Sequence, residues 1–510
     1  MKNWFIPRTA AVCIVFLLQA SAVFAGGYHF RYDSWANHAI RYLNLLHYQD
    51  NLFWNEMPYS RADMNTLLHK TFDSGGMQAF FRRRLAEEIS FGLNQRSATG
   101  RGLELELANL FTFHQDIDEK KTARWRTDIR AYAEVESNLS LYLDFEIDTD
   151  GLYDSDYHSR KKWHEITGDM KAAYFLYSRE HWSLLAGREY VHWGPGYTGS
   201  LLTSGLAPSL DMIQLTANIW KFRFQGFSAM LNQSRPEEDR DHVNRYLSGH
   251  RLSIRLPRVE MGIHETVVYG GPGAVWMAAY TNPLMPYYFT DFMFQENDSH
   301  ANVSLAMDAG VYWPETMRWY GQFMVDEYYY DEDRGKYPDQ TALLAGMDWA
   351  RALAWDRLWI NAEYIRVSRW VYNYTVPWYW NRLYYYNSLL GHPLGPDADW
   401  IHLQQELAVG RDVVIRLSQD FIRHGETTND TPLNTQDLEV HPPFPYGIVE
   451  KTLGINAELE FFPSENIRFT GQVKYARTEN TGHQPDDISE GFSFYVSLNY
   501  RYRHFFGIEP

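Results

Sequence analysis

The feature that most constrains this chain is a strict alternation of apolar and polar residues between positions 126 and 148. Odd positions carry the apolar side chains, which are Ile129, Ala131, Ala133, Val135, Leu139, Leu141, Leu143, Phe145 and Ile147. Successive side chains of a β-strand point to opposite faces, so this period of two predicts two strands joined by a tight turn at Ser137-Asn138. Similar alternation recurs over 103–113, 222–227, 252–256, 455–461, 467–475 and 492–502.

The spacing of the connections indicates how these strands are arranged. Short turns are expected near 137, 180, 220, 257, 314, 355, 410 and 464, and longer polar or aromatic connections lie between them. Outer-membrane barrels alternate short periplasmic turns with long outer loops, and their strands of about 9 to 11 residues cross the bilayer at a tilt. We therefore predict an all-β transmembrane barrel of about 18 antiparallel strands over residues 101–510. The patterns near 182–190 and 340–351 are weak, so a barrel of about 16 strands is an alternative, and a secreted two-sheet sandwich is another.

The N-terminus predicts export. Lys2 and Arg8 precede an apolar run over 9–18, and Val23-Phe-Ala25 places small residues at a cleavage site, so residues 1–25 are interpreted as a signal peptide. An uncleaved anchor helix is the alternative, but the run is shorter than the roughly 20 residues that a helical span needs. Cleavage would remove Cys13, the single cysteine, so the mature chain would hold together without disulfides. The formal net charge of -17 argues against a nucleic-acid partner.

Residues 26–100 show helical spacing instead. Apolar residues recur every three or four positions from Trp35 to Leu46 and from Met77 to Ile89, and Ser60-Arg-Ala-Asp63 is a capping box. Three short helices are predicted here, and because isolated helices of this length are marginal, they should pack on one another or on the barrel. Arg82-Arg83-Arg84 is interpreted as a solvated helix face, and contact with anionic lipid or with the mouth of a barrel is the alternative.

A resemblance to a known family adds to this pattern. The segment 187–208, with the sequence GREYVHWGPGYTGSLLTSGLAP, resembles the most recognisable stretch of the capsule-assembly Wzi family, and residues 41–43 and 57–63 resemble that family's N-terminal part. The resemblance implies an outer-membrane barrel of a Gram-negative bacterium with a periplasmic helical bundle. It also implies a lectin that attaches capsular polysaccharide or exopolysaccharide to the cell, surrounded by outer-membrane lipid and lipopolysaccharide. The chain departs from the pattern at Gly205-Leu206, where amides are expected, and at its non-aromatic terminus.

The backbone chemistry of Trp193-Gly194-Pro195-Gly196 has its own interpretation. Glycines permit positive φ angles on both sides of a proline whose φ is fixed, which favours a rigid turn at the barrel rim or inside the lumen. A structural role is therefore favoured over ligand contact for this motif.

Two aromatic clusters are the candidate glycan-binding sites, because sugars present an apolar face to aromatic rings and polar edges to carboxylates and amides. Residues 370–386 are rich in Trp and Tyr around Pro377, and a second cluster combines rings with acids. The candidate residues are Trp378, Tyr379, Trp380, Tyr384 and Tyr385 in the first cluster and Tyr328, Asp331 and Asp333 in the second. An aromatic girdle at the lipid interface is the alternative interpretation of the first cluster.

The sequence offers little for catalysis or cofactors. It contains no HExxH, no nucleophile elbow and no cysteine pair, and Asp148-Thr-Asp150-Gly151 begins like a calcium loop but lacks the remaining spacing. We therefore expect a non-enzymatic polysaccharide-binding barrel without a metal or cofactor. A sugar-selective porin is the alternative function, and a barrel hydrolase is a less favoured one.

Overall fold

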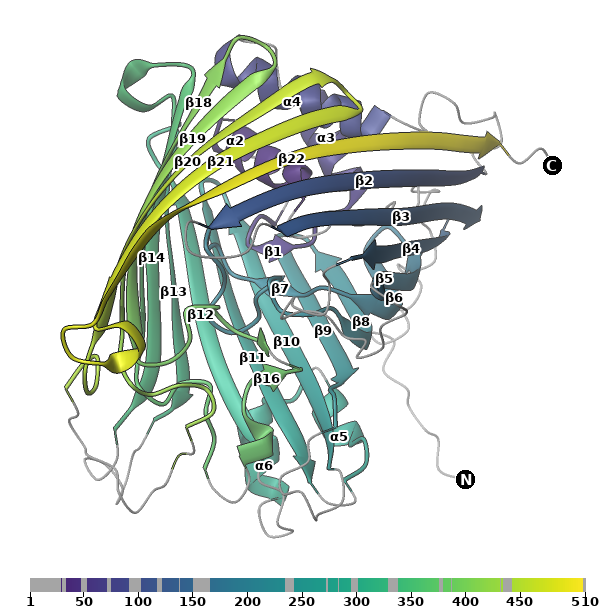
Figure 1. Ribbon diagram of the computed structural model, residues 1–510. Helices are drawn as coiled ribbons and strands as arrows, with labels where there is room; N and C mark the ends of the chain where they lie inside the picture. Colours follow the sequence, from purple (N-terminus) through teal and green to yellow (C-terminus); the bar gives the residue numbers. More distant parts are fainter. Residues whose placement is uncertain are drawn as a thin grey trace, which may run out of the picture.

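The computed structural model describes most of the chain after residue 28. The described residues are 29, 34–46, 53–70, 75–90, 102–116, 122–136, 138–149, 166–233, 243–271, 274–282, 284–294, 301–328, 338–375, 379–386, 388–431, 433 and 443–507. The predicted signal peptide lies outside these residues and stays a prediction. Eighteen of the described strands form one closed barrel, so the barrel prediction is confirmed and both alternatives, about 16 strands and a sandwich, are wrong (Figure 1).

The barrel strands pair antiparallel in chain order. They are β2 (Gly102–Asp116), β3 (Thr122–Glu136), β4 (Leu139–Asp148), β5 (Thr167–Ser178), β6 (Trp182–Glu189), β8 (Leu210–Ile219), β9 (Phe222–Met230), β10 (Asn244–Leu256), β11 (Val259–Gly271), β12 (Asn302–Tyr312), β13 (Met317–Glu327), β14 (Gln340–Ala350), β15 (Leu358–Val367), β18 (Ala398–Val409), β19 (Val413–His424), β20 (Glu450–Ser464), β21 (Ile467–Glu479) and β22 (Ile488–Gly507). The two weak patterns are the strands β6 and β14. All eight short turns fall where the sequence predicts them.

The alternation between residues 126 and 148 sets the two faces of the wall. Ile129 pairs with Phe145 and Arg130 with Asp144 in the register of β3 and β4. Val135 and Leu143 are exposed on the outer face, whereas the Arg130 guanidinium lies inside and contacts Asp144 at 3.2 Å. An apolar outer face and a polar inner face are what a membrane barrel requires.

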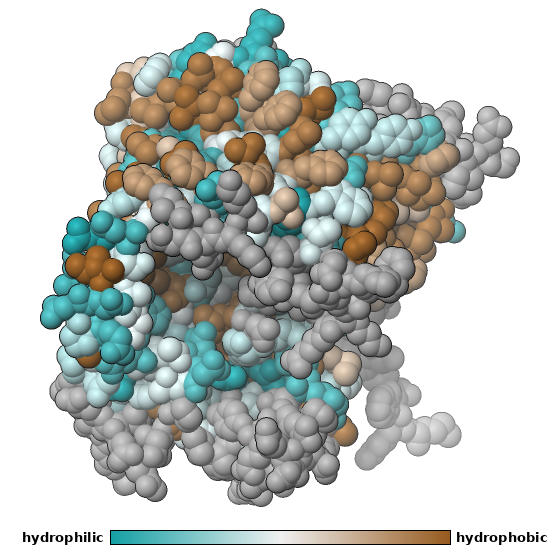
Figure 2. Space-filling view, in the orientation of Figure 1, coloured by the Kyte–Doolittle hydropathy of each residue, from teal (hydrophilic) through white to brown (hydrophobic). Residues whose placement is uncertain are grey.

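The strands that close the barrel carry the same pattern to the end of the chain. β22 pairs with β2 from Gly102↔Gly507 to Asp116↔Ser493. Phe111, Val496 and Tyr502 are exposed on the outer face here, and Figure 2 shows apolar residues gathered in a band around this closure. The aromatic residues at the end of β22 therefore contribute to the apolar wall although the chain does not end on one.

Three N-terminal helices lie at the end of the barrel where the short turns are, opposite the end that carries α5 (Ala278–Thr281) and α6 (Tyr287–Phe294) (Figure 1). They are α2 (Trp35–Leu46), α3 (Arg61–Lys70) and α4 (Gly76–Ser90). The capping box is present, since the Asp63 amide donates to Ser60 Oγ at 3.2 Å and the Ser60 amide to Asp63 Oδ2 at 3.1 Å. No helix within the described ranges is long and apolar enough to cross a membrane.

The helices pack into the mouth of the barrel rather than beside it. The rings of His38 and Tyr42 in α2 lie 4.9 and 5.6 Å from that of Trp359, a buried inner residue of β15. From α4, the Arg84 guanidinium contacts Asp412 at 3.0 Å in the turn between β18 and β19. The prediction of a solvated arginine face is therefore wrong for Arg84, which is buried against the barrel, and the alternative of contact with the barrel mouth holds for this residue.

Candidate functional site

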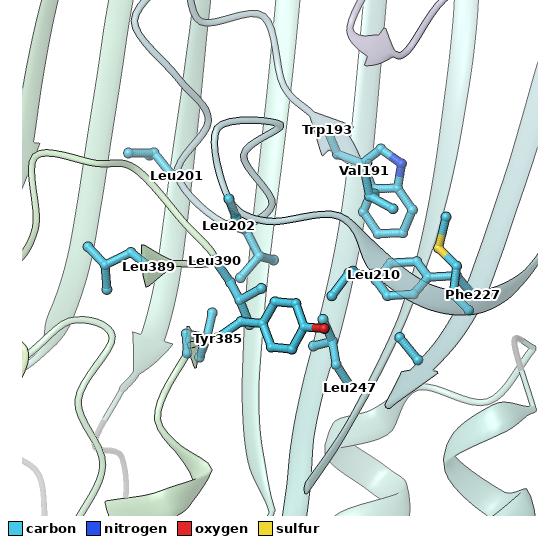
Figure 3. Packing of buried hydrophobic residues seen from close by; sticks show 14 of the residues in the cluster. Val191, Trp193, Leu201, Leu202, Leu210, Phe227, Leu247, Tyr385, Leu389 and Leu390 are labelled. Carbon is cyan, nitrogen blue, oxygen red and sulfur yellow. The ribbon is translucent and has the colours of Figure 1, made fainter. Parts of the chain in front are cut away.

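The segment between β6 and β8, which contains the Trp-Gly-Pro-Gly motif, leaves the wall and folds into the lumen. His192–Trp193 forms the short strand β7, which pairs antiparallel with β1 (Glu56–Met57). The Trp193 ring is fully buried, packs 5.3 Å from Phe227 of β9 and donates from Nε1 to Gln225 Oε1 at 2.8 Å. Figure 3 shows Trp193 and its apolar neighbours inside the barrel. The motif therefore lies in the lumen, where it joins two distant parts of the chain.

The two glycines of the motif are needed for different reasons. Gly194 has a φ of 149°, in the region that favours glycine. The prediction of a positive φ is wrong for Gly196, whose φ angle is not positive. A Cβ on Gly196 would instead lie 1.9 Å from the carbonyl oxygen of Gly199. Gly196 is therefore required by the close approach of two backbone segments.

The wall holds this turn by accepting its backbone amides. The Glu363 carboxylate of β15 accepts the amides of Tyr197 at 2.7 Å and Thr198 at 2.9 Å. Arg41 of α2 donates to the Gly196 carbonyl at 3.1 Å and contacts Asp348 at 3.0 Å. Burial by itself lowers the pKa of Arg41, but Asp348, Tyr320 and Glu363 together outweigh burial and raise that pKa above its usual range. The first helix, the motif and the wall are thus one connected unit.

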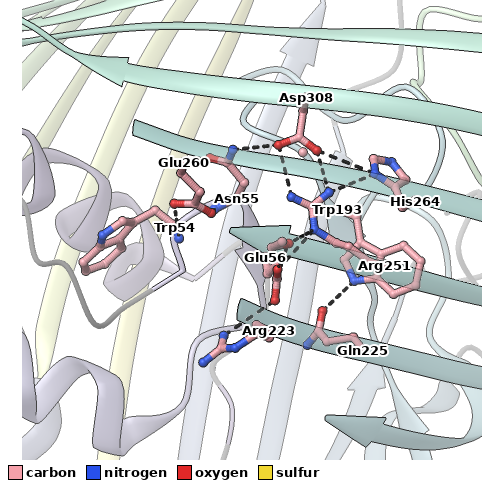
Figure 4. A network of polar contacts seen from close by, with 12 residues as sticks. Trp54, Asn55, Glu56, Trp193, Arg223, Gln225, Arg251, Glu260, His264 and Asp308 are labelled. Atoms are coloured by element: carbon pink, nitrogen blue, oxygen red, sulfur yellow. Dashed lines mark hydrogen bonds and ion pairs between the residues drawn. The ribbon is translucent and has the colours of Figure 1, made fainter. Parts of the chain in front are cut away.

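A buried ionic network fixes the strand β1 to the wall (Figure 4). Arg251 of β10 is fully buried and donates to Asp308 Oδ2 at 2.5 Å and to Glu56 Oε1 at 3.2 Å. Asn55 Nδ2 donates to Asp308 Oδ1 at 2.7 Å, and the Glu260 carboxylate accepts the Asn55 amide at 2.8 Å. Because a buried charge without its partner costs several kcal/mol, this network favours one position for the N-terminal segment.

The described residues of the connection between β15 and β18, which are 368–375, 379–386 and 388–397, also fold into the lumen. Its Tyr372 is buried, donates from its hydroxyl to the Leu201 carbonyl at 2.7 Å, and donates its amide to Asp326 at 2.7 Å. The short strands β16 (Tyr384–Tyr385) and β17 (Ser388–Leu389) form a hairpin here. We call three inward segments the plug, and they are 53–57, 190–209 and the described residues of 368–397. The second and third of these segments share an apolar cluster with inner residues of the wall from β3 to β15.

Two buried histidines belong to the plug. His392 Nδ1 accepts the Leu394 amide at 3.1 Å and its Nε2 lies 3.0 Å from Thr198 Oγ1. His192 Nδ1 accepts the Gly205 amide at 3.2 Å, and its Nε2 lies 3.1 Å from the Gly194 carbonyl. Burial lowers the pKa of each imidazole to about 3, so both rings are neutral at neutral pH.

The part of the lumen beside α2 is polar and contains cavities. Two cavities of about 210 and 370 Å³ adjoin α2 and share Trp35 and Arg468 in their linings. Charged residues of the wall, such as Arg416 and Glu458, line the larger one.

The predicted glycan-binding residues differ in how far they are buried. Trp380 and Tyr385 are buried, and Trp380 Nε1 donates to the Gly270 carbonyl at 3.4 Å, so neither ring is available to a sugar unless the plug opens. Tyr384 is half-buried, and Tyr328 is 54% exposed at the outer end of β13. Trp378, Asp331 and Asp333 lie outside the described residues. Tyr379 begins the turn η5 (Tyr379–Asn381), and its side chain is likewise not described.

A neighbouring loop brings further rings and charges to the outer mouth. Thr375 and Leu433 form a β-bridge that places connections 368–397 and 425–449 side by side. The guanidinium carbons of Arg366 and Arg369 lie 3.9 Å from the ring centroid of Phe444 and 3.3 Å from that of Tyr446. We define the mouth face as Arg366, Arg369, Arg382, Tyr384, Asp430, Phe444 and Tyr446. The run HPPFPYG at 441–447 was a signal in the sequence for its second half.

The mouth face combines half-buried rings with charged edges. Arg382 lies 4.7 Å from the ring centroid of Tyr384 and 2.9 Å from Asp430, which is well exposed. Arg369 also donates to Thr427 at 2.8 Å. Below the face, Asp397 accepts the amides of Thr427 at 3.3 Å and Tyr446 at 3.0 Å, which holds the outer loop in place. Burial raises the pKa of the Asp397 carboxyl.

An apolar barrel wall, a lumen occupied by the chain itself and helices at the short-turn end define an outer-membrane β-barrel of the plugged class. The family model described as "Capsule assembly protein Wzi" matches residues 94–488, and the chain belongs to that family. The family resemblance of the motif is thereby confirmed, and so is the outer-membrane location.

One solved structure of a Wzi protein shares this fold. The Wzi structure from Escherichia coli is 13% identical with a TM-score of 0.62, and the match covers 91% of this chain and 98% of that one. The Pseudomonas aeruginosa outer-membrane protein OprD is 10% identical with a TM-score of 0.44, over 79% of this chain and 94% of that one. No match was found among curated protein sequences.

Proposed function

We propose that this protein binds capsular polysaccharide or exopolysaccharide with its mouth face and anchors it at the cell surface. The observation that carries the proposal is the meeting of two outer loops, which sets the rings of Tyr384 and Tyr446 among arginines and an exposed carboxylate. Family membership supports it, and the E. coli relative is described as a carbohydrate-binding β-barrel involved in group 1 capsule assembly.

The chemistry of the mouth face suits an acidic polysaccharide. Aromatic rings offer a flat apolar surface to a sugar ring at low entropic cost, and truncation of such anchors costs on the order of 2 kcal/mol or more. Guanidinium groups pair with carboxylates in a fixed, two-pronged geometry, so Arg366, Arg369 and Arg382 would favour uronic acids or other anionic substituents. Trp378 and Tyr328 remain candidates for further contacts. The proposed action is binding without a chemical step, a metal or a cofactor.

The orientation in the membrane follows from the connections. Short turns lie on the periplasmic side of outer-membrane barrels, so we place α2 to α4 in the periplasm and the mouth face outside. We propose the division of the chain that the sequence predicts, with residues 1–25 as a cleaved signal peptide, residues 26–100 as the periplasmic helical region and residues 101–510 as the barrel.

A cellular test can separate binding from folding. In a strain that lacks the native copy, the parent chain and the variant Tyr384→Ala/Tyr446→Ala would be expressed, and cell-bound and released polysaccharide would be measured. We expect the variant to release at least tenfold more polysaccharide while remaining in the outer membrane with unchanged heat-modifiable mobility. Trp220→Ala is the matched control, since it removes an 81%-exposed ring from the opposite end of the barrel. Equal retention in all strains would contradict the proposal.

The sugar-selective porin is the second candidate, favoured by the polar cavities beside α2. Single-channel recording in planar bilayers distinguishes the two functions. A plugged binding protein should show no steady open channel, whereas a porin should conduct continuously and its current should be blocked by sugars.

A further inference from the structure

Two short helices in the connection between β11 and β12 pack against the outside of the barrel at β10 and β11. In β10 and β11 the inward-facing Leu247 and Val268 pack in the lumen cluster, whereas their outward-facing neighbours Tyr246 and Val267 belong to a separate buried cluster. That second cluster contains Tyr280 of α5 and Tyr287 of α6. We call the described residues 274–282 and 284–294 the outer flap. Its helices therefore lie on the face of the wall that elsewhere meets lipid.

Specific polar contacts hold the outer flap against the wall. The carboxylate of Glu265, an outward-facing residue of β11, accepts the amides of Tyr287 at 2.7 Å and Tyr288 at 3.0 Å, which begin α6. His250 Nε2 lies 3.2 Å from the same carboxylate, and Trp276 Nε1 donates to Ser228 Oγ at 3.0 Å. The flap is thus docked in one orientation, with a defined outer surface.

The outer flap reaches well down the wall. Glu265 lies six residues before Gly271, where β11 ends. At about 3.3 Å per residue and a tilt near 45°, this contact is about 14 Å below the strand end. Ile263, the next outward residue of β11, is 47% exposed, and it pairs with the exposed Met307 of β12. The flap therefore continues directly into the lipid-facing band.

The surface that the outer flap presents is apolar. Leu284 is 83% exposed and Phe289 62% exposed, and Val275, Trp276 and Tyr288 are exposed beside them. The sequence from 266 to 290 contains no Asp, Glu, Lys, Arg or His, whereas the outer connection at 328–339 carries several charges. A connection bathed in water would gain nothing from this composition. Exposed Trp and Tyr side chains beside exposed aliphatic ones are typical of a segment at a membrane interface.

We infer that the outer flap is embedded in the outer leaflet of the membrane, with Leu284 and Phe289 among the lipid acyl chains. We assign lipid as the partner of this surface because the flap extends the band of exposed apolar residues that lipid covers on the rest of the wall. Burial of exposed Leu and Phe side chains in an apolar phase is favourable, so the flap would fix the height of this side of the barrel in the membrane. The inference rests on the outer-membrane location and is independent of polysaccharide binding.

Nitroxide labelling of the full mature chain tests the inference. Because Cys13 is the single cysteine and lies in the predicted signal peptide, Leu284→Cys and Phe289→Cys each give a unique attachment site. The labelled protein would be reconstituted in phospholipid vesicles, and power saturation would measure the accessibility of the nitroxide to oxygen and to a water-soluble nickel chelate. Val473→Cys on the outer face of β21 is the lipid control, and Gly482→Cys in the outer turn η6 (Thr481–His483) is the water control. Val275→Cys replaces either variant if it fails to fold.

The inference predicts that both flap positions resemble Val473, with high oxygen and low chelate accessibility, at every protein-to-lipid ratio. Chelate accessibility equal to that of Gly482 would overturn it, because the flap would then be in water. Exclusion of both reagents that disappears on dilution with lipid would also overturn it, since a second copy of the chain would then cover the flap.

Discussion

The Trp-Gly-Pro-Gly turn offers a sharp test of how the plug is held, through the substitution Gly196→Ala. The added methyl group would lie 1.9 Å from the Gly199 carbonyl oxygen, a backbone atom that cannot rotate away. Overpacking of this kind costs about 1 to 3 kcal/mol, and the wall should survive because Gly196 is not part of it. Gly471→Ala is the matched control, since Gly471 lies in β21 with nothing within 4 Å of the added atom.

The loss of stability in Gly196→Ala should appear as a larger fraction of molecules in which the plug is locally open. Leu201 is fully buried in the plug, so Leu201→Cys provides a unique thiol that a maleimide reaches only when the plug opens. If opening equilibrates before labelling, 1 to 3 kcal/mol corresponds to a labelling rate about 5- to 150-fold higher in the Gly196→Ala background. Gly471→Ala should change the rate less than about twofold. Equal rates in the two glycine variants would refute the close-approach argument.

Four further predictions concern the buried ionic network, the two plug histidines, the N-terminal helices and the outer flap. Arg251→Met leaves Asp308 buried without its arginine partner and leaves Glu56 only the more distant Arg223, at 3.6 Å. It should lower the free energy of unfolding by about 3 to 5 kcal/mol, measured by urea titration in detergent; an unchanged midpoint would show that the network carries no net stability. The pKa of His192 and of His392 is about 3 in the folded protein and about 6.5 in the unfolded chain, so their contribution to stability is full above pH 6.5 and falls toward pH 3. At pH 5 the loss is about 2 kcal/mol per ring. Thermal melting at pH 5 and pH 7.5 should show this loss, and His392→Gln should remove part of it. Deleting residues 28–95 should leave a barrel that inserts but is less stable or leakier; unchanged melting and unchanged bilayer conductance would show that the helices are an independent appendage. Glu265→Ala should raise the mobility of a nitroxide at Leu284, seen as a narrower spectrum, whereas Glu479→Ala, a distant exposed carboxylate at the end of β21, should not.

The wall of this protein could be predicted from the sequence because its signal is local. The alternation in β3 and β4 is imposed by lipid on one side and polar groups on the other, and each short turn follows directly from the end of a pattern. Even the weak strand β6 could be placed, since its neighbours fixed where it had to lie.

The lumen and the outer flap could not be predicted because their contacts join residues far apart in the sequence. Nothing local links Glu56 to Arg251, and the burial of Trp380 and Tyr385 depends on a plug assembled from three separate segments. The run from 266 to 290 is visibly uncharged, yet only the register of β11 shows that Val267 faces outward and is covered. Gly196 shows the same limit, since a glycine reveals neither its φ angle nor the atom beside it.

The most direct test of polysaccharide binding uses the purified protein in lipid nanodiscs. Polysaccharide isolated from the surface of the bacterium that encodes this chain would be titrated onto the parent, the Tyr384→Ala/Tyr446→Ala variant and the Trp220→Ala control, and binding would be followed by surface plasmon resonance. Loss of two stacking rings, each worth on the order of 2 kcal/mol, predicts that the apparent Kd of the double variant rises by at least tenfold while the control matches the parent. Equal affinity of all three folded proteins would contradict the assignment of the mouth face as the binding site.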